Sequence, residues 1–247
     1  MQSPIHRLRS FATSASLLFA IGLFLLPPRA EALTVAGFGD SMTWPPGYLV
    51  QLPSEWETVN LSQGGECSWD GLVRLQQLLP TLEADVVILM EGTNDVRSIY
   101  YTFPRSIESF TGMIDAVLDA GLLPVLMAPP PMLPWDPNGP ADHANGQLQA
   151  LATALADLAD SKGIPFVNLL DIFAALDNLD SYYLDGLHLD ADGSGVIASA
   201  LAPVIRDAVF TPEPSTALLL GAGLMQLARA RRQASSRASS RDVRKLS

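Results

Sequence analysis

The stretch Leu-Thr-Val-Ala-Gly-Phe-Gly-Asp-Ser-Met-Thr-Trp occupies residues 33–44 and decides which fold the sequence predicts. Its first part, Leu33–Phe38, is apolar without regular alternation, which is typical of a strand buried on both faces of a parallel sheet. Gly39 and Asp40 follow at once, and glycine allows a sharp turn that presents Ser41 beyond the end of the strand. Because ligands of open α/β sheets bind beyond the carboxyl ends of the strands, Ser41 is a candidate functional residue.

Four further apolar runs have the length of buried strands, and helical spacing of apolar residues separates them. The predicted strands are Thr58–Leu61, Asp85–Met90, Leu122–Met127 and Pro165–Leu169. The predicted helices are marked by leucines at 72, 75, 78 and 79, and by apolar residues within 107–117, 148–158 and 197–205. This alternation predicts one domain over residues 33–210, an open α/β sheet with helices on both faces. The long proline-rich loop 129–146 is expected to form the rim of a binding cleft.

The amino-terminal segment, residues 1–32, has the pattern of a signal peptide. A basic start precedes an apolar stretch at 11–26, and Ala30-Glu31-Ala32 provides a site for signal peptidase. A membrane anchor is the alternative, but Thr13 and Ser14 interrupt the apolar stretch, which is short for a stable span. We therefore expect cleavage after Ala32 and a mature protein that works outside the cytoplasm.

Acidic residues dominate the predicted domain. The whole chain carries a net charge of −11, but residues 33–210 hold 23 acidic and five basic residues, a net charge of −18. Such a surface repels nucleic acid and anionic lipid head groups, so no nucleic-acid partner is expected. A neutral sugar or a short ester remains compatible with it. The single cysteine, Cys67, excludes an intramolecular disulfide.

Two separate turns hold residue types that nucleophilic catalysis requires. A serine nucleophile needs a base, and the base needs an acceptor that fixes its tautomer. The turn Asp185-Gly186-Leu187-His188 could supply both groups, with Ser41 as the nucleophile. Taken alone, Asp40 and Ser41 fit a helix N-cap better than a catalytic turn, and a dinucleotide loop would need a third glycine. His188 alone fits a structural turn, while His143 is expected to be a solvated surface group.

Turns after the second and third predicted strands could stabilise an oxyanion. Gly64-Gly65 lies in one of them, and Gly92-Thr93-Asn94-Asp95 forms the other. A glycine N–H and an asparagine amide at strand ends can direct donors at a developing negative charge. Each could also be a routine strand-to-helix turn, where glycine and asparagine are common. Four turns with suitable residues in this chain order favour a functional interpretation.

With these four turns together, the sequence resembles the GDSL/SGNH hydrolases, whose ordered sequence blocks supply Ser, Gly, Asn and His. The resemblance covers residues 33–210, and the surroundings of Gly65 are similar to the compact thioesterase/lysophospholipase branch. Met42 stands where the family motif has leucine. The resemblance implies a three-layer α/β/α fold with a five-stranded parallel sheet, flavodoxin-like in arrangement. The family's functional positions correspond here to Ser41, Gly65, Asn94, Asp185 and His188.

The resemblance also implies a mechanism of acyl transfer. Ser41 attacks the ester carbonyl, His188 accepts its proton and Asp185 orients the imidazole. The amides of Ser41 and Gly65 and the side chain of Asn94 hold the oxyanion, and water then hydrolyses the acyl-enzyme. No metal or cofactor is needed. Either Gly64 or Gly65 could donate, and we expect Gly65 to do so.

The carboxyl-terminal segment resembles a PEP-CTERM sorting signal. Pro212-Glu213-Pro214 precedes an apolar run at 217–228 and an arginine cluster that begins at Arg229. The resemblance implies an exosortase as a processing partner, transient membrane anchoring by residues 211–232, and a location in the periplasm, on the outer surface or outside the cell. The run is short for a span and contains Gln226, so a disordered basic tail is the alternative. Residues 233–247 are expected to be a disordered basic tail.

The predicted function is therefore an exported serine esterase for short acyl or O-acetyl esters, including those on polysaccharides. Alternatives are a lysophospholipase- or thioesterase-like enzyme for longer acyl chains, and a non-catalytic surface protein that binds carbohydrate. The complete residue set favours catalysis, because a binding protein needs no base with an orienting carboxylate. Aromatic side chains near the site could stack on a sugar, line an acyl pocket or pack within loops. They are Trp44, Trp69, Trp135, Tyr100 and Tyr101.

Overall fold

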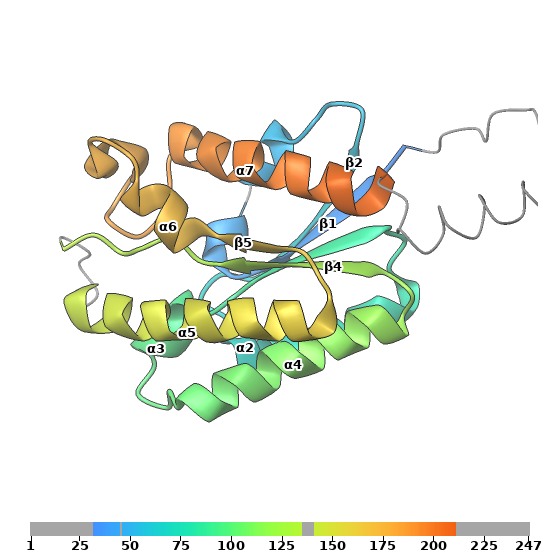
Figure 1. The fold of residues 1–247 in the computed structure, drawn as a ribbon, viewed down its shortest axis with the longest axis horizontal. Coiled ribbons are helices and arrows are strands. Elements are labelled where there is room, and N and C mark those ends of the chain that lie inside the picture. Colours follow the sequence, from blue (N-terminus) through green and yellow to red (C-terminus); the bar gives the residue numbers. More distant parts are fainter. Residues whose placement is uncertain (1–31, 45, 135–140, 211–247) are drawn as a thin grey trace, which may run out of the picture.

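The computed structural model describes residues 32–44, 46–134 and 141–210, and these form a five-stranded parallel sheet between two layers of helices (Figure 1). The strand order is β2-β1-β3-β4-β5. The strands are β1 (Thr34–Gly39), β2 (Glu57–Ser62), β3 (Val86–Met90), β4 (Leu123–Ala128) and β5 (Phe166–Asn168). The predicted three-layer α/β/α fold is confirmed, and the strand order is that of flavodoxin-like sheets.

Helices cover both faces of the sheet (Figure 1). One layer contains α2 (Ser68–Leu78), α3 (Thr93–Arg97), α4 (Phe103–Asp119) and α5 (Ala141–Lys162). The other contains α6 (Leu169–Ala174) and α7 (Ala191–Phe210), together with the short 3-10 helix η2 (Tyr48–Gln51). Three further 3-10 turns are η1 (Ser41–Thr43), η3 (Leu79–Thr81) and η4 (Leu179–Tyr182).

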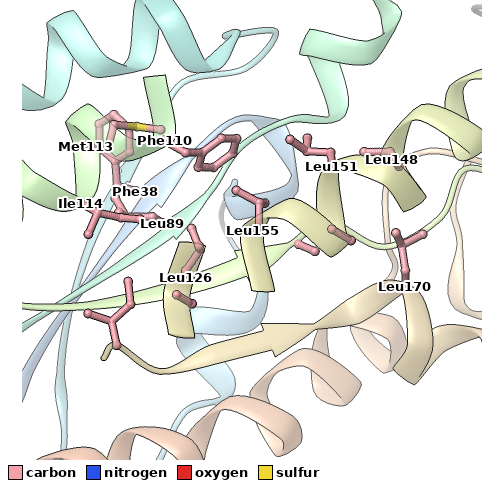
Figure 2. Packing of buried hydrophobic residues seen from close by; sticks show 14 of the residues in the cluster. Phe38, Leu89, Phe110, Met113, Ile114, Leu126, Leu148, Leu151, Leu155 and Leu170 are labelled. Carbon is pink, nitrogen blue, oxygen red and sulfur yellow. The ribbon is translucent and has the colours of Figure 1, made fainter. Parts of the chain in front are cut away.

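The sheet separates two hydrophobic cores. Successive side chains of a strand point to opposite faces, so a strand covered on both sides is apolar throughout. In β3, Val87 and Leu89 join the core beneath α4 and α5, while Val86, Ile88 and Met90 join the core beneath α7. Figure 2 shows the first core, where Phe38, Leu89 and Leu126 from the strands meet side chains of α4 and α5.

The helix α7 is apolar and long enough to cross a membrane by length and composition alone. Its apolar side chains instead pack on the sheet, with Ile197, Leu201 and Ile205 fully buried in the second core. The composition of α7 is therefore explained by its place as a core helix.

The central strand β1 sets the position of the predicted site. It pairs in parallel with β2 and β3, and Gly39 lies level with Ser62 on one side and Met90 on the other. The segments that follow these three strands therefore leave the sheet at the same edge. They contain Ser41, the Gly64-Gly65 turn and Asn94.

The loop after β4 differs from the prediction. It was expected to run to Gly146, but α5 already begins at Ala141, so His143 lies exposed in the first turns of that helix. Asn145 explains the early start, because its side chain accepts a hydrogen bond from the Met132 N–H (2.8 Å) and donates one to the Met132 carbonyl (2.7 Å). These bonds fix the beginning of the helix against the chain that leaves β4.

Several predictions concern residues outside the described ranges. They are the signal peptide up to residue 31, Trp135, the sorting segment 211–232 and the basic tail 233–247.

Candidate active site

Ser41 is the first residue of η1, directly beyond the end of β1. Asp40 caps this short helix, and its Oδ1 atom accepts a hydrogen bond from the Met42 N–H at 2.8 Å. Gly39 is required by close packing, since a Cβ atom there would lie 2.2 Å from the carbonyl oxygen of Met90. The N-cap interpretation thus applies to Asp40, which leaves the Ser41 side chain free for another role.

The structure joins Ser41, His188 and Asp185 in one hydrogen-bonded chain. The Nε2 atom of His188 lies 3.0 Å from Ser41 Oγ, and its Nδ1 atom lies 2.8 Å from Asp185 Oδ2. The other carboxylate oxygen of Asp185 accepts the backbone N–H groups of His188 at 2.7 Å and of Leu187 at 3.0 Å. Because a carboxylate only accepts, Nδ1 carries the proton and Nε2 can accept the proton of the Ser41 hydroxyl.

Hydrogen bonds keep Asp185 ionised. Partial burial raises the pKa of Asp185. The hydrogen bonds from the His188 ring and from the backbone N–H groups of His188 and Leu187 outweigh this effect and hold the pKa below its usual range. The carboxylate is therefore charged at neutral pH and fixes the tautomer of His188.

The Gly64-Gly65 turn lies beside Ser41. A Cβ atom placed on Gly64 would lie 3.8 Å from the Cβ atom of Ser41, so this backbone runs past the serine side chain. Gly65 has a φ of 77°, in the left-handed region that glycine adopts without strain. Gly64 is thus close to Ser41, and Gly65 is the next residue of the same turn.

Asn94, the second residue of α3, bonds to the turns after β1 and β2. Its Nδ2 atom donates to Asp40 Oδ2 and to the carbonyl oxygen of Glu66, each at 3.0 Å. The two acceptors fix the orientation of the amide, since its oxygen could not face them. Both amide hydrogens are engaged within the protein, so a bound oxyanion would have to share one of them.

The sequence did not point to a buried group of charged side chains that supports these turns. Asp95 accepts hydrogen bonds from the Ser68 N–H (2.7 Å), the Ser68 hydroxyl (2.5 Å) and the Ser106 hydroxyl (2.6 Å), and so ties α3 to α2 and α4. Glu66 forms an ion pair with Arg74 of α2. Asp95 directly follows Asn94 in the chain, and Glu66 directly follows Gly65. This adjacency is the only local signal for the two acidic residues in the sequence.

Two carboxyl groups in this region take up a proton at higher pH than usual. Burial raises the pKa of Asp40 to about 7. The hydrogen bond from the Met42 N–H lowers this pKa, whereas the charges of Asp95 and Glu66 raise it further. Burial also raises the pKa of Glu91 well above its usual range, as do the charges of Asp40 and Glu66. The Glu91 carboxyl oxygens are buried, and in its protonated form this carboxyl group can donate a hydrogen bond to Glu66. A side chain of similar shape that cannot ionise should therefore stabilise the fold at this position.

Replacing Glu91 by glutamine is expected to stabilise the protein increasingly as pH rises. Above the ordinary carboxyl pKa, the folded protein keeps a proton on Glu91 that the unfolded chain releases, so wild-type stability falls by up to about 1.4 kcal/mol per pH unit. Glu91→Gln stays neutral and escapes this decline, which begins near the ordinary carboxyl pKa and continues as pH rises toward the raised pKa of folded Glu91. Urea unfolding across that range measures it, with the exposed Glu108→Gln as control. A difference that is constant with pH would contradict the burial of a neutral acid.

A cavity of about 520 Å³ opens next to Ser41 and His188. Of the aromatic residues named from the sequence that lie in the described ranges, Trp44 alone lines it. The Arg105 guanidinium instead lies over Trp69, with its Cζ atom 3.9 Å from the centre of the Trp69 ring. Tyr100 is exposed. Within residues 32–44, 46–134 and 141–210, no three His, Cys, Asp or Glu side chains are grouped to hold a metal ion.

A hydroxyl, an imidazole and a carboxylate in one hydrogen-bonded chain can move a proton off the hydroxyl as it attacks a carbonyl carbon. This arrangement, at the carboxyl end of a central parallel strand, is that of an α/β serine hydrolase. The chain belongs to the GDSL-like Lipase/Acylhydrolase family, whose sequence profile matches residues 34–196. It is a carboxylic ester hydrolase.

Solved structures share the fold. A carbohydrate acetylesterase from Sinorhizobium meliloti superposes with a TM-score of 0.61 at 21% identity, covering 71% of this chain and 99% of that chain. A GDSL-like lipase from Bacteroides thetaiotaomicron gives 0.62 at 19% identity, covering 78% and 98%. The aryl esterase of M. smegmatis gives 0.60 at 20% identity, covering 71% and 99%. A search of curated protein sequences found no match.

Proposed function

We propose that this ester hydrolase uses Ser41 as its nucleophile, His188 as its base and Asp185 as the group that orients the base. The hydrogen-bonded chain from Asp185 through His188 to Ser41, at 2.8 Å and 3.0 Å, carries the proposal. Ser41 Oγ bonds to the ester carbonyl carbon while its proton passes to Nε2 of His188. The same proton then goes to the departing alcohol, which leaves an acyl group on Ser41. Water then attacks the acyl carbonyl carbon while His188 accepts a proton from it. The Ser41 oxygen leaves and takes up that proton, which releases the carboxylic acid.

The oxyanion of the tetrahedral intermediate would be held by the backbone N–H groups of Ser41 and Gly65 and by the Asn94 amide. Gly64 and Gly65 both lie in the turn beside Ser41, and Gly65 matches the family motif. Asn94 also holds Asp40 and the Glu66 carbonyl together, so it positions the turn that supplies the glycine donor.

Replacing Asn94 by alanine is expected to lower kcat by about 10² to 10³, the usual cost of losing one oxyanion donor. Because that donor acts mainly on the transition state, KM should change little. Steady-state kinetics on p-nitrophenyl acetate measures the effect, and Asn168→Ala at the end of β5 is the control. A rise in KM at constant kcat would assign Asn94 to ground-state binding instead.

We further propose that the substrates are short acyl or O-acetyl esters, including those on polysaccharides. The net charge of −18 over residues 33–210 opposes an anionic substrate such as a coenzyme A thioester or an anionic lipid. The described residues that line the cavity include Asp185 and Asp190 and no lysine or arginine. Likeness to a carbohydrate acetylesterase and an aryl esterase supports the same substrate class.

An acyl-chain series tests this proposal on the full-length protein. We expect kcat/KM to be highest for p-nitrophenyl acetate and to fall toward the octanoate, and we expect release of acetate from acetylated glycans. Labelling of Ser41 by a fluorophosphonate, mapped by peptide mass, tests the nucleophile independently. A steady rise in kcat/KM toward long chains would favour the lipase-like alternative, and a folded wild-type protein that resists labelling would favour the non-catalytic one.

Export is part of the proposal. The basic start, the apolar stretch at 11–26 and the Ala30-Glu31-Ala32 site support removal of a signal peptide, and the Pro212-Glu213-Pro214 segment supports processing by an exosortase. Amino-terminal sequencing of the protein from a periplasmic fraction should begin at Leu33. Retention of residues 1–32 would favour a membrane anchor.

A further inference from the structure

The cavity beside Ser41 has two walls from distant parts of the chain. One wall comes from residues within 41–44 and 46–51, which include η1 and η2, and the other from residues within 184–194, which lead into α7. Gln51 connects them, because its Nε2 atom donates to the carbonyl oxygen of Ala191 at 2.7 Å. The volume of about 520 Å³ falls in the range of about 300–1,000 Å³ that is typical of small-molecule sites. It far exceeds the needs of an acetyl group.

The cavity lies on the imidazole side of Ser41. Asp185 and His188 line it, whereas Gly65 and Asn94 do not belong to its described lining. The segments that carry Gly65 and Asn94 lead into α2 and α3, in the opposite helical layer from α7 (Figure 1). Ser41 therefore stands between the proposed oxyanion donors and the cavity.

This placement decides which half of an ester the cavity receives. In the tetrahedral intermediate the oxyanion points toward its N–H donors, while the oxygen of the departing alcohol must come within reach of the proton on His188 Nε2. The alcohol therefore lies on the imidazole side. We propose that the cavity binds the alcohol half of the ester, and that this alcohol is an uncharged ring with an apolar face. The inference rests on the proposed acyl-transfer function.

The lining selects the class of alcohol. Trp44, Val50 and Leu184 line the cavity and remain 61%, 65% and 70% exposed, so they present apolar surface that a ligand can cover. An indole ring packs well against the flat face of a sugar or an aryl ring. The Asp190 carboxylate can accept hydrogen bonds from hydroxyl groups, and the described lining offers no cation for an anionic alcohol. Sugar and aryl alcohols share this chemistry.

The kinetic consequence is specific. Every acetate ester gives the same acetyl-Ser41 once its alcohol has left, so the cavity influences acylation and not the hydrolysis of the acyl-enzyme. Its contribution is therefore found in kcat/KM when the alcohol varies at constant acyl group. A cavity for the acyl chain would show the opposite pattern, with selectivity changing along an acyl series at constant alcohol.

The experiment compares ethyl acetate, benzyl acetate and 6-O-acetylglucose on full-length wild type, Trp44→Ala and Leu184→Ala. Ethyl and benzyl alcohol are similar leaving groups, so their ratio reports binding of the ring. In each variant, we expect kcat/KM for at least one ring ester, relative to ethyl acetate, to fall about fivefold to tenfold. A fall for benzyl acetate identifies an aryl alcohol, and a fall for 6-O-acetylglucose identifies a sugar alcohol. Val73→Ala, an exposed apolar residue of α2 outside the cavity, should keep the wild-type ratios.

Two results would overturn the inference. One is unchanged ratios for both ring esters in both variants. The other concerns ethyl octanoate, measured as a fourth substrate: if its ratio to ethyl acetate falls more than either ring-ester ratio, the cavity belongs to the acyl chain. Because Leu184 is largely exposed, Leu184→Ala keeps the test valid if Trp44→Ala does not fold. A wild-type protein that hydrolyses none of these esters would instead contradict the proposed function.

Discussion

Ser41→Ala is expected to lower kcat/KM for p-nitrophenyl acetate by about 10⁴-fold or more, while the protein keeps its fold. The substitution removes the Ser41 Oγ atom, which is hydrogen-bonded to the Nε2 atom of His188. The remaining activity would come from oxyanion stabilisation and substrate binding alone. Ser41 is partly exposed, so removal of its hydroxyl leaves no large cavity. Steady-state kinetics and fluorophosphonate labelling measure the two consequences.

The matched control is Ser161→Ala, which removes an exposed hydroxyl on α5 that donates to the Leu158 carbonyl. It should behave as wild type in both assays. A Ser41→Ala protein that retains wild-type turnover would eliminate Ser41 as the nucleophile.

His188→Ala is expected to cause a loss of similar size, about 10⁴-fold or more, because Ser41 then has no base to take its proton. When two residues act as one unit, the losses of activity from replacing them do not add. The double variant Ser41→Ala/His188→Ala should therefore be no slower than either single variant. Kinetics of the three variants on one substrate measures both statements. An additive loss in the double variant would show that the two side chains act separately.

The exposed His143 provides the control for this variant. It lies in the first turns of α5, and His143→Ala should leave kcat/KM unchanged. A loss in His143→Ala as large as that in His188→Ala would contradict the assignment of the base.

The sequence predicted the strands well because burial on both faces leaves a strong local pattern. In β3, all five residues from Val86 to Met90 are buried, and no polar position interrupts the run. The helices α3 and α6 were not predicted, because five and six residues are too short to display helical periodicity. The early start of α5 depends on bonds from Asn145 to Met132, which are invisible in a local pattern.

The candidate site shows the same division. Residue types at strand ends suggested Ser41, Gly65 and Asn94, since strand direction alone brings these turns to one edge. The burial of Glu91 was not predicted, because a glutamate after an apolar run equally well marks the exposed end of a strand. Nor could the sequence pair Trp44 with Leu184 across one cavity, since their separation along the chain gives no periodic signal.

The bond between Ser41 and His188 joins residues 147 positions apart, near the beginning and the end of the folded domain. A polypeptide whose synthesis has not yet reached Asp185, or one cleaved before that residue, has the alcohol without its proton acceptor. Hydrolysis therefore starts only when the turn 185–188 has come to lie beside Ser41 at the end of β1. Turnover thus reports that the first strand and the last loop of the folded domain have been brought together.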